Sequence, residues 1–147
     1  MNAGSNENAE IRRLFSEHIP EVASGVVELK SIARVTGQRT MVAVQSSDPG
    51  ICPVGSCVGF RGVRVKAIMK RLTGDKVDIV RWSESVEEFI RNALAPVRVE
   101  RIVFDPAAHS ATVHASPENR SLITRDQGSR LRLISRLVGW EMRVMDT

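Results

Sequence analysis

The 147-residue chain has no tyrosine, only four phenylalanines and two tryptophans, and only two cysteines. RNA-binding sheets of the RRM and OB type stack bases on exposed aromatic rings, so this composition argues against such a platform. Two cysteines do not make a disulfide framework and fit a reducing compartment best. No apolar run approaches the roughly 20 residues of a membrane span. The polar first residues lack a signal-peptide core, so we expect a cytoplasmic protein.

The chain also lacks the residue groupings that catalysis or metal binding requires. Cys52 and Cys57 stand close together, but His18, His109 and His114 are scattered along the sequence. These are too few ligands at too irregular a spacing for a zinc site. No nucleophile, base and orienting acid form a recognisable set. We therefore expect a protein that is not an enzyme and that holds no metal or cofactor.

What the chain does contain is positive charge gathered in two places. Apolar residues make up 42% and charged residues 26%, a globular composition with a net charge of only +4. The window 59–76 nevertheless holds six basic residues and one acid, and the window 120–143 holds six basic residues and two acids. The rest of the chain is therefore acidic. Basic charge confined to two windows indicates polyanion binding there.

The most informative motif is Gly59-Phe60-Arg61-Gly62, which lies between two apolar helical stretches. Two glycines three positions apart allow a tight turn and a close approach to a ligand. The following helix offers unpaired N–H groups and a partial positive charge at its start, where a phosphate binds well. Arg61, Arg64 and Lys66 lie within reach of such an anion. The motif predicts a clamp for a phosphate backbone, with a plain helix–turn–helix corner as the alternative.

The predicted elements occur in the same order in two halves of the chain. The polar segment 1–10 is interpreted as a disordered lead-in. The first half then contains a helix, two strands, a helical stretch, the glycine loop, a second helix and a strand. Their predicted ranges are 11–19, 26–35, 40–45, 54–58, 59–62, 63–72 and 77–80.

The second half repeats this order. Ser85 and Glu88 have the spacing of a capping box at the start of a helix that Pro96 ends. Strands are predicted at 97–104 and 111–115, a helix beginning at Leu122, a loop ending at Gly128, a helix at 130–138 and a strand at 140–145.

The two loops also align residue by residue. When Gly62 is placed over Gly128, Arg64 falls on Arg130 and Lys66 on Arg132. Apolar positions coincide as well for two turns of helix. Because a single-domain fold has no reason to repeat such a pattern, the sequence indicates an internal duplication.

A helix–GxxG–helix element combined with a three-stranded sheet resembles a KH domain of type II. The strings at 19–34, 48–59, 78–84 and 136–140 resemble the tandem KH region of the NusA family of bacterial transcription elongation, termination and antitermination factors. The resemblance covers residues 11–144. It implies an α+β fold of two consecutive KH domains, at 11–83 and 84–147. Each would have a three-stranded sheet with helices packed on one face.

In the KH family, the loop holds the backbone of about four nucleotides of single-stranded RNA while the bases lie in an apolar groove. The resemblance therefore implies RNA contacts along both loops and the helices that follow them. In the first unit these residues are Gly59, Phe60, Arg61, Gly62, Arg64, Lys66 and Lys70, and in the second they are Arg125, Asp126, Gln127, Gly128, Arg130 and Arg132.

The second loop departs from the family pattern. Arg125 occupies the position of its first glycine, and Ser129-Arg130 replaces the usual Gln-Asn. A close backbone approach is in doubt there, although Arg125 itself could contact phosphate. We therefore expect the first unit to be the better-preserved clamp. Trp82 and Trp140 follow strands and are expected to pack inside the protein rather than to stack on bases.

The expected function is non-catalytic binding of single-stranded RNA, without membrane association. NusA proteins carry further domains ahead of the KH pair, so this sequence is expected to be a fragment or a short relative. RNA polymerase and other transcription factors are the expected protein partners of the longer protein. Two alternatives stay open. The chain could dock on RNA polymerase or ribosomal proteins, which Arg125 favours, or act as an RNA-processing or ribosome-maturation KH factor.

Overall fold

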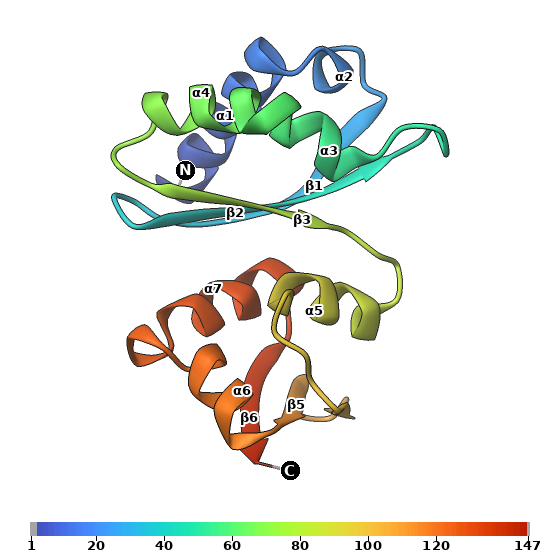
Figure 1. Cartoon of the computed structure of the whole chain (residues 1–147), viewed down its shortest axis with the longest axis vertical. Coiled ribbons are helices and arrows are strands. Elements are labelled where there is room, and N and C mark those ends of the chain that lie inside the picture. The colour runs from blue at the N-terminus through green and yellow to red at the C-terminus, as the bar shows by residue number, and fades with distance from the viewer. Residues whose placement is uncertain (1–2, 147) are drawn as a thin grey trace. The chain divides into compact units, whose positions relative to one another are not determined.

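The computed structural model describes residues 3–146 of the chain. It divides into two compact units, Met1–Trp82 and Ser83–Thr147; the predicted boundary falls one residue later, after Ser83. Each unit has a three-stranded sheet with helices on one face (Figure 1). This confirms the α+β fold class with two consecutive units. No helix among residues 3–146 combines the length and the apolar composition needed to cross a bilayer.

The first unit follows the predicted order of elements. They are α1 (Ala3–His18), α2 (Pro20–Ala23), β1 (Val27–Val35), β2 (Arg39–Ser46), α3 (Pro53–Val58), the 3₁₀ turn η1 (Phe60–Gly62), α4 (Val63–Arg71) and β3 (Lys76–Arg81). The strand order is β1-β2-β3, with β1 antiparallel and β3 parallel to β2. A parallel neighbour needs a crossover connection, and α3, the loop and α4 provide it.

The N-terminal helical region is longer than the predicted helix. Helix α1 begins at Ala3, so helical backbone occupies most of the segment 1–10 for which the sequence predicts a lead-in; Met1 and Asn2 lie outside the described residues. Pro20 follows the end of α1 and then starts α2. A proline cannot continue a helix, but its fixed φ suits the first turn of the next one.

The core of the first unit lies between the sheet and these helices. Ile11, Leu14, Phe15 and Ile19 are at most 2% exposed, and they recur at the predicted helical spacing. They pack with apolar residues of β1 and β2 and with one anchor from each helix beside the glycine loop. Those anchors are Cys57 of α3 and Ile68 of α4. The loop is therefore held at both ends by buried side chains.

A buried ion pair joins the β1–β2 hairpin to the end of the α4–β3 connection. Arg34 Nε donates to Asp75 Oδ2 at 2.8 Å, and Thr40 Oγ1 and the Gly37 N–H each donate to the same carboxylate at 2.7 Å. Asp75 is only 2% exposed. Burial opposes its ionisation, but the hydrogen bonds from Arg34, Thr40 and Gly37 outweigh burial and lower the pKa of Asp75 below 3.8.

The second unit repeats the fold without a counterpart of α2. Its elements are α5 (Val86–Leu94), β4 (Arg101–Asp105), β5 (Ser110–Ala115), α6 (Pro117–Ile123), η2 (Asp126–Gly128), α7 (Ser129–Val138) and β6 (Glu141–Asp146). The strand order is β4-β5-β6, again antiparallel and then parallel. Ser85 accepts a hydrogen bond from the Glu88 N–H and caps α5 as predicted.

Two predicted ranges in this unit were wrong. The helix expected to begin at Leu122 is α6, which begins at Pro117 and ends at Ile123. The start signal is Ser116, whose side chain accepts from the Asn119 N–H, followed by proline at the first helical position. The strand expected from Val97 begins only at Arg101. Before it, the Val99 carbonyl accepts from the Arg91 guanidinium instead of from a neighbouring strand.

Replacing Asp75 with asparagine should destabilise the first unit by about 3–5 kcal/mol, because the buried Arg34 would lose its carboxylate. Urea unfolding measures this. Since the pKa of Asp75 is lowered by folding, its contribution is complete above pH 3.8 and is lost as the pH falls through the folded pKa. In the Asp75→Asn variant, the free energy of unfolding should no longer show the fall at low pH that protonation of Asp75 causes.

Glu28→Gln is the matched control, because Glu28 forms an exposed pair with Lys30 at 3.9 Å. It should change the free energy of unfolding by less than about 1 kcal/mol. Equal effects of the two substitutions would contradict a structural role for the Arg34–Asp75 pair.

Candidate nucleic-acid interface

The glycine loop has a backbone that ordinary residues rarely adopt. Gly59 has φ 77° and ψ 173°, a region that is essentially reserved for glycine. Arg61 (φ 54°) and Gly62 (φ 73°) are left-handed. The Gly59 N–H donates to the Gly55 carbonyl at 2.9 Å, and the Gly62 N–H donates to the Gly59 carbonyl at 3.0 Å. The backbone of Gly59 in this turn therefore needs glycine, while the left-handed position of Gly62 favours it.

The predicted contact residues lie on the outside of this turn. Phe60 is 79% exposed and Val63 is 61% exposed. Arg61 is exposed, with its guanidinium carbon 5.2 Å from the centre of the Phe60 ring. Lys66 and Lys70 are exposed on α4. The structure thus places an apolar tip beside three accessible cations.

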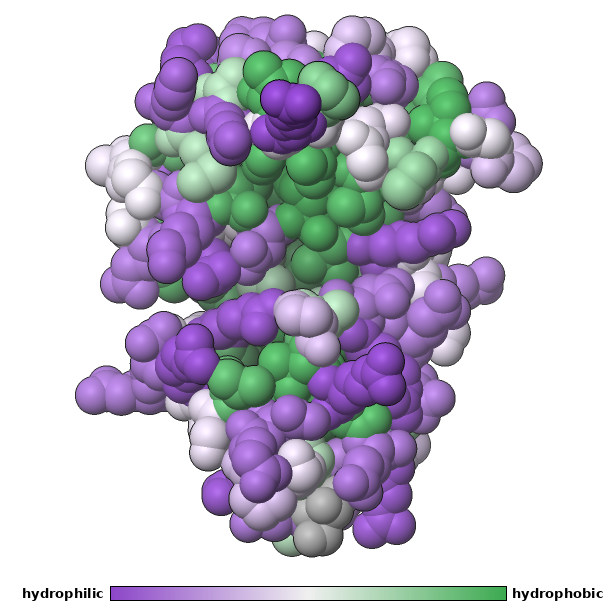
Figure 2. All heavy atoms as spheres, viewed as in Figure 1, coloured by the Kyte–Doolittle hydropathy of each residue, from purple (hydrophilic) through white to green (hydrophobic). Residues whose placement is uncertain are grey.

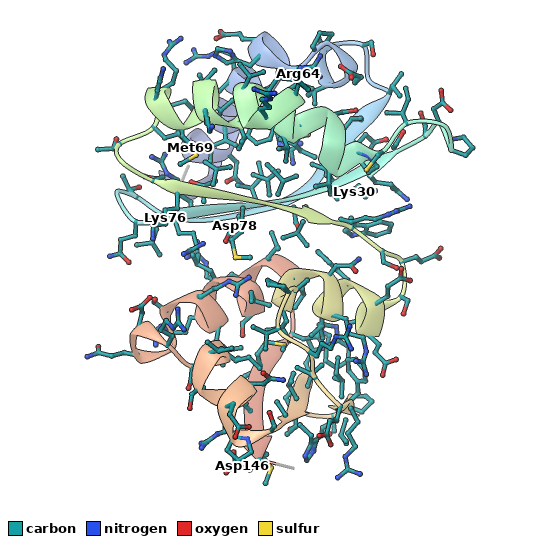
Figure 3. All side chains as sticks on the ribbon, viewed as in Figure 1. Lys30, Arg64, Met69, Lys76, Asp78 and Asp146 are labelled. Carbon is teal, nitrogen blue, oxygen red and sulfur yellow. The ribbon has the colours of Figure 1, made fainter. Side chains whose placement is uncertain are left out.

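Arg64, also predicted as a contact residue, is turned into the protein. On the first turn of α4 (Figure 3), its Nη1 donates to Glu21 Oε1 and Oε2 at 3.0 and 3.2 Å. The same nitrogen donates to the Ser56 carbonyl at 2.8 Å. A hydrogen bond from the backbone of Glu21 itself, and then the Arg64 guanidinium, lower the pKa of Glu21, although partial desolvation opposes this. Arg64 therefore ties α4 to α2 and α3.

An apolar strip runs along the first unit beside the loop. Figure 2 shows apolar side chains gathered where α3 and α4 lie over β3. Met69 of α4 points toward β3 (Figure 3) and is half-buried. Val54, Val77 and Ile79 pack against the core but stay partly exposed. Strand β3 is at the edge of its sheet, so the strip borders a strand edge.

A hollow of about 420 Å³ lies on another side of the loop. It is lined by the turn before α3 (Gly50, Ile51 and Cys52), by α3 itself (Gly55 and Ser56) and by Glu21, Gly59, Phe60 and Arg64. Glu21 and Arg64 both line this hollow and neutralise each other as an ion pair at 3.0 Å, so the hollow offers a phosphate no unpaired cation among its lining residues.

The second loop keeps most of this geometry without its first glycine. Gln127 (φ 58°, ψ 29°) and Gly128 (φ 76°, ψ 16°) match Arg61 (φ 54°, ψ 28°) and Gly62 (φ 73°, ψ 17°) closely. Arg125 instead has an ordinary φ of −53°, and Asp126 takes a left-handed φ of 58°. Aspartate tolerates that conformation better than most residues do. The turn therefore survives the loss of the glycine.

The cations of the second loop are arranged differently from those of the first. Arg130 Nη2 donates to the carbonyls of Ala93 and Ala95 at 3.2 and 3.3 Å. Arg132 Nη1 donates to the Gln127 carbonyl at 2.7 Å. Arg125, Asp126 and Gln127 are exposed. Arg132 is exposed in spite of this bond, whereas Arg130 is half-buried, so Arg125 and Arg132 are the predicted cations that this loop presents to solvent.

The sequence did not single out Glu21 or the Ser56 carbonyl as parts of the site. They belong to α2 and α3, and only folding brings them to Arg64. The one available signal was the string 19–34, which contains Glu21. Cys57 is buried, which raises its pKa to about 12, so it serves as a core residue. Among residues 3–146, no cluster of three or more His, Cys, Asp or Glu could hold a metal ion.

The tryptophans make contacts inside their units. Lys30 Nζ lies 4.7 Å from the centre of the Trp82 ring. Trp140 stacks on His109 at 4.0 Å and meets Phe104 edge-on at 5.2 Å. These contacts support the predicted packing role of both rings.

Comparisons with known proteins agree with this geometry. A family model described as the NusA-like first KH domain matches residues 5–82, and one described as the NusA-like second KH domain matches residues 86–147. The solved structure "Crystal structure of APE1850" has a TM-score of 0.64 at 18% identity and covers 92% of this chain and 96% of its own. That likeness shows the fold alone.

Curated relatives are more similar in sequence. The chain is 42% identical to "Transcription termination/antitermination protein NusA" of Thermus thermophilus over 132 residues, which cover 90% of this chain and 34% of the relative. It is 41% identical to the Bacillus subtilis protein of the same name over 134 residues, covering 91% and 36%. The chain therefore spans about a third of the length of these relatives.

Gly59→Ala should destabilise the first unit by about 2–3 kcal/mol, because the residue would need a glycine-only conformation. An added Cβ would also lie 2.7 Å from Arg64 Cγ. Gly74→Ala is the control: Gly74 has a similar φ of 72°, but nothing lies within 4 Å of its added Cβ. It should cost only about 1 kcal/mol. Urea unfolding of both variants measures the difference, and an equal cost would contradict the special backbone conformation and close Arg64 contact assigned to Gly59.

Proposed function

Because the chain belongs to the NusA-like KH-domain family, we propose that it is the RNA-binding region of a transcription termination/antitermination factor. It binds single-stranded RNA without catalysing a reaction on it. The observation that carries this proposal is the exposed first loop, in which a strained turn between two anchored helices presents Phe60 and Arg61 to solvent.

In this proposal the RNA backbone lies across the loop and the start of α4. The first turn of α4 directs N–H groups and a partial positive charge outward, where a phosphate is stabilised. Arg61 contacts a phosphate directly, and Lys66 and Lys70 contact phosphates further along the strand. Phe60 packs on a sugar or a base at the tip.

The bases lie on the apolar strip that α3, α4 and β3 form. Bases have flat apolar faces, which half-buried Val54, Met69 and Ile79 accommodate without aromatic partners. The edge of β3 offers backbone groups for hydrogen bonds to base edges. This arrangement explains how a chain so poor in aromatic residues binds RNA.

The second unit binds more weakly than the first. Its loop keeps the left-handed turn but has Arg125 in place of the first glycine and no exposed apolar residue at the position of Phe60, where Asp126 brings a negative charge. Exposed Arg125 supplies its main phosphate contact. When one RNA strand meets both units, the second contact is intramolecular and gains from the covalent link between them. RNA polymerase and other transcription factors are the protein partners that we propose for a longer protein.

Wild-type protein should bind single-stranded RNA with a logarithmic salt slope of about −2 to −3.5, which corresponds to roughly 3–5 neutralised phosphates. The double variant Phe60→Asp/Arg61→Asp should lose this binding, because two carboxylates replace the loop's apolar tip and cation. Fluorescence anisotropy at several salt concentrations measures both. The thermal transition should change little, since both side chains are exposed.

Arg13→Asp makes a similar charge reversal on α1, where Arg13 is 66% exposed. It should retain most of the RNA affinity. A salt-independent affinity of the wild type, or intact binding by the loop variant, would contradict the proposed interface.

A further inference from the structure

Among the predicted contact residues of the first loop, all of which the structure describes, Arg64 forms an ion pair with a carboxylate, that of Glu21. Its Nη1 makes all three short contacts, two with Glu21 and one with the Ser56 carbonyl. Its side chain is 31% exposed and that of Glu21 is 27% exposed. The Glu21 carboxylate already offsets the charge of Arg64, so an RNA phosphate would gain less from this arginine than from an arginine without a carboxylate partner.

The stem of Arg64 also fills the space beside Gly59. A Cβ at Gly59 would meet Cγ, Cβ and Cδ of Arg64 at 2.7, 3.0 and 3.1 Å. The arginine therefore lies against the backbone at the point where the loop takes its glycine-only conformation. Glu21 holds the guanidinium of Arg64 in place. It therefore also determines where the aliphatic part of Arg64 contacts the backbone at Gly59.

The second unit offers a partial parallel. Arg130, which aligns with Arg64, also donates to its own unit, but its acceptors are the Ala93 and Ala95 carbonyls at the end of α5, the first helix of the unit. The acceptor there is backbone rather than a glutamate, since this unit has no counterpart of α2. In both units, the arginine two positions after the last loop glycine hydrogen-bonds to its own unit, although the loops differ in sequence.

From this geometry we propose that Glu21 and Arg64 are positioning residues for the RNA-binding loop. Arg64 acts through Gly59 rather than by contacting RNA, and Glu21 acts through Arg64. This inference rests on the proposed function, and it removes Arg64 from the set of predicted phosphate ligands. It adds Glu21, which lies in another helix and carries the charge opposite to that of a usual RNA contact.

The test uses Glu21→Gln and Arg64→Met in the full chain, with Glu17→Gln as control. Glu17 forms an exposed pair with Arg13 at 3.8 Å on α1. RNA affinity, its salt slope, and hydrogen exchange of the Gly59 and Gly62 amides are measured for each variant. The amides report the loop directly, because they donate to Gly55 and Gly59 within it.

If the residues position the loop, Glu21→Gln weakens RNA binding about fivefold or more and speeds exchange of both amides. Neither variant changes the salt slope, and the double variant binds no worse than Arg64→Met alone. Glu17→Gln changes nothing.

If Arg64 contacts phosphate instead, Arg64→Met reduces the slope by about 0.7, the value for one phosphate of a single strand. Glu21→Gln then leaves the affinity unchanged or raises it, because a negative charge has gone and Arg64 is released. Either result overturns the inference but leaves RNA binding intact. Failure of the wild type to bind RNA would instead refute the proposed function, and unchanged amide exchange in Glu21→Gln would still overturn the loop-positioning role.

Discussion

The first loop depends on two buried anchors on either side of it. Cys57 of α3 and Ile68 of α4 are fully buried in the core, so the two helices cannot move apart without opening apolar surface to water. The short connection between them must reverse direction at once, and Gly59, Arg61 and Gly62 accept left-handed or glycine-only backbone to do so. Phe60 and Arg61 are exposed because the turn leaves no room for them inside. The core therefore holds the loop in the exposed position that the proposed RNA binding needs.

Comparison of the two units shows which backbone positions of the loop keep the same conformation. Gly62 and Gly128 have nearly identical dihedral angles, and so do the residues before them. The first glycine is not constrained in the same way, since Arg125 moves the left-handed conformation on to Asp126. The loop tips differ as well, because Asp126 stands where the first unit exposes Phe60. The two units therefore share a fold but differ in the surface that their loops present.

The sequence predicted most of the fold because its signals were local. Apolar spacing located α1 and α5, and the capping box at Ser85 placed the start of α5. The errors arose where a tertiary contact decided the outcome or a local signal was overlooked. Strand β4 begins at Arg101, and before it the Val99 carbonyl accepts from Arg91 of α5, while the Ser116-Pro117 start of α6 was visible but missed. The positions of the candidate site residues on the loops followed from the motif. The motif did not predict that Arg64 binds Glu21, because Glu21 is distant in sequence and belongs to a different helix.

The most direct measurement of the central claim is an amide chemical-shift map recorded while a short single-stranded RNA is added to isotope-labelled protein. The account predicts that the largest shifts fall at residues 59–66 and along β3, with smaller shifts at residues 125–128. Shifts confined to other surfaces, or no shifts at the first loop at RNA saturation, would contradict it.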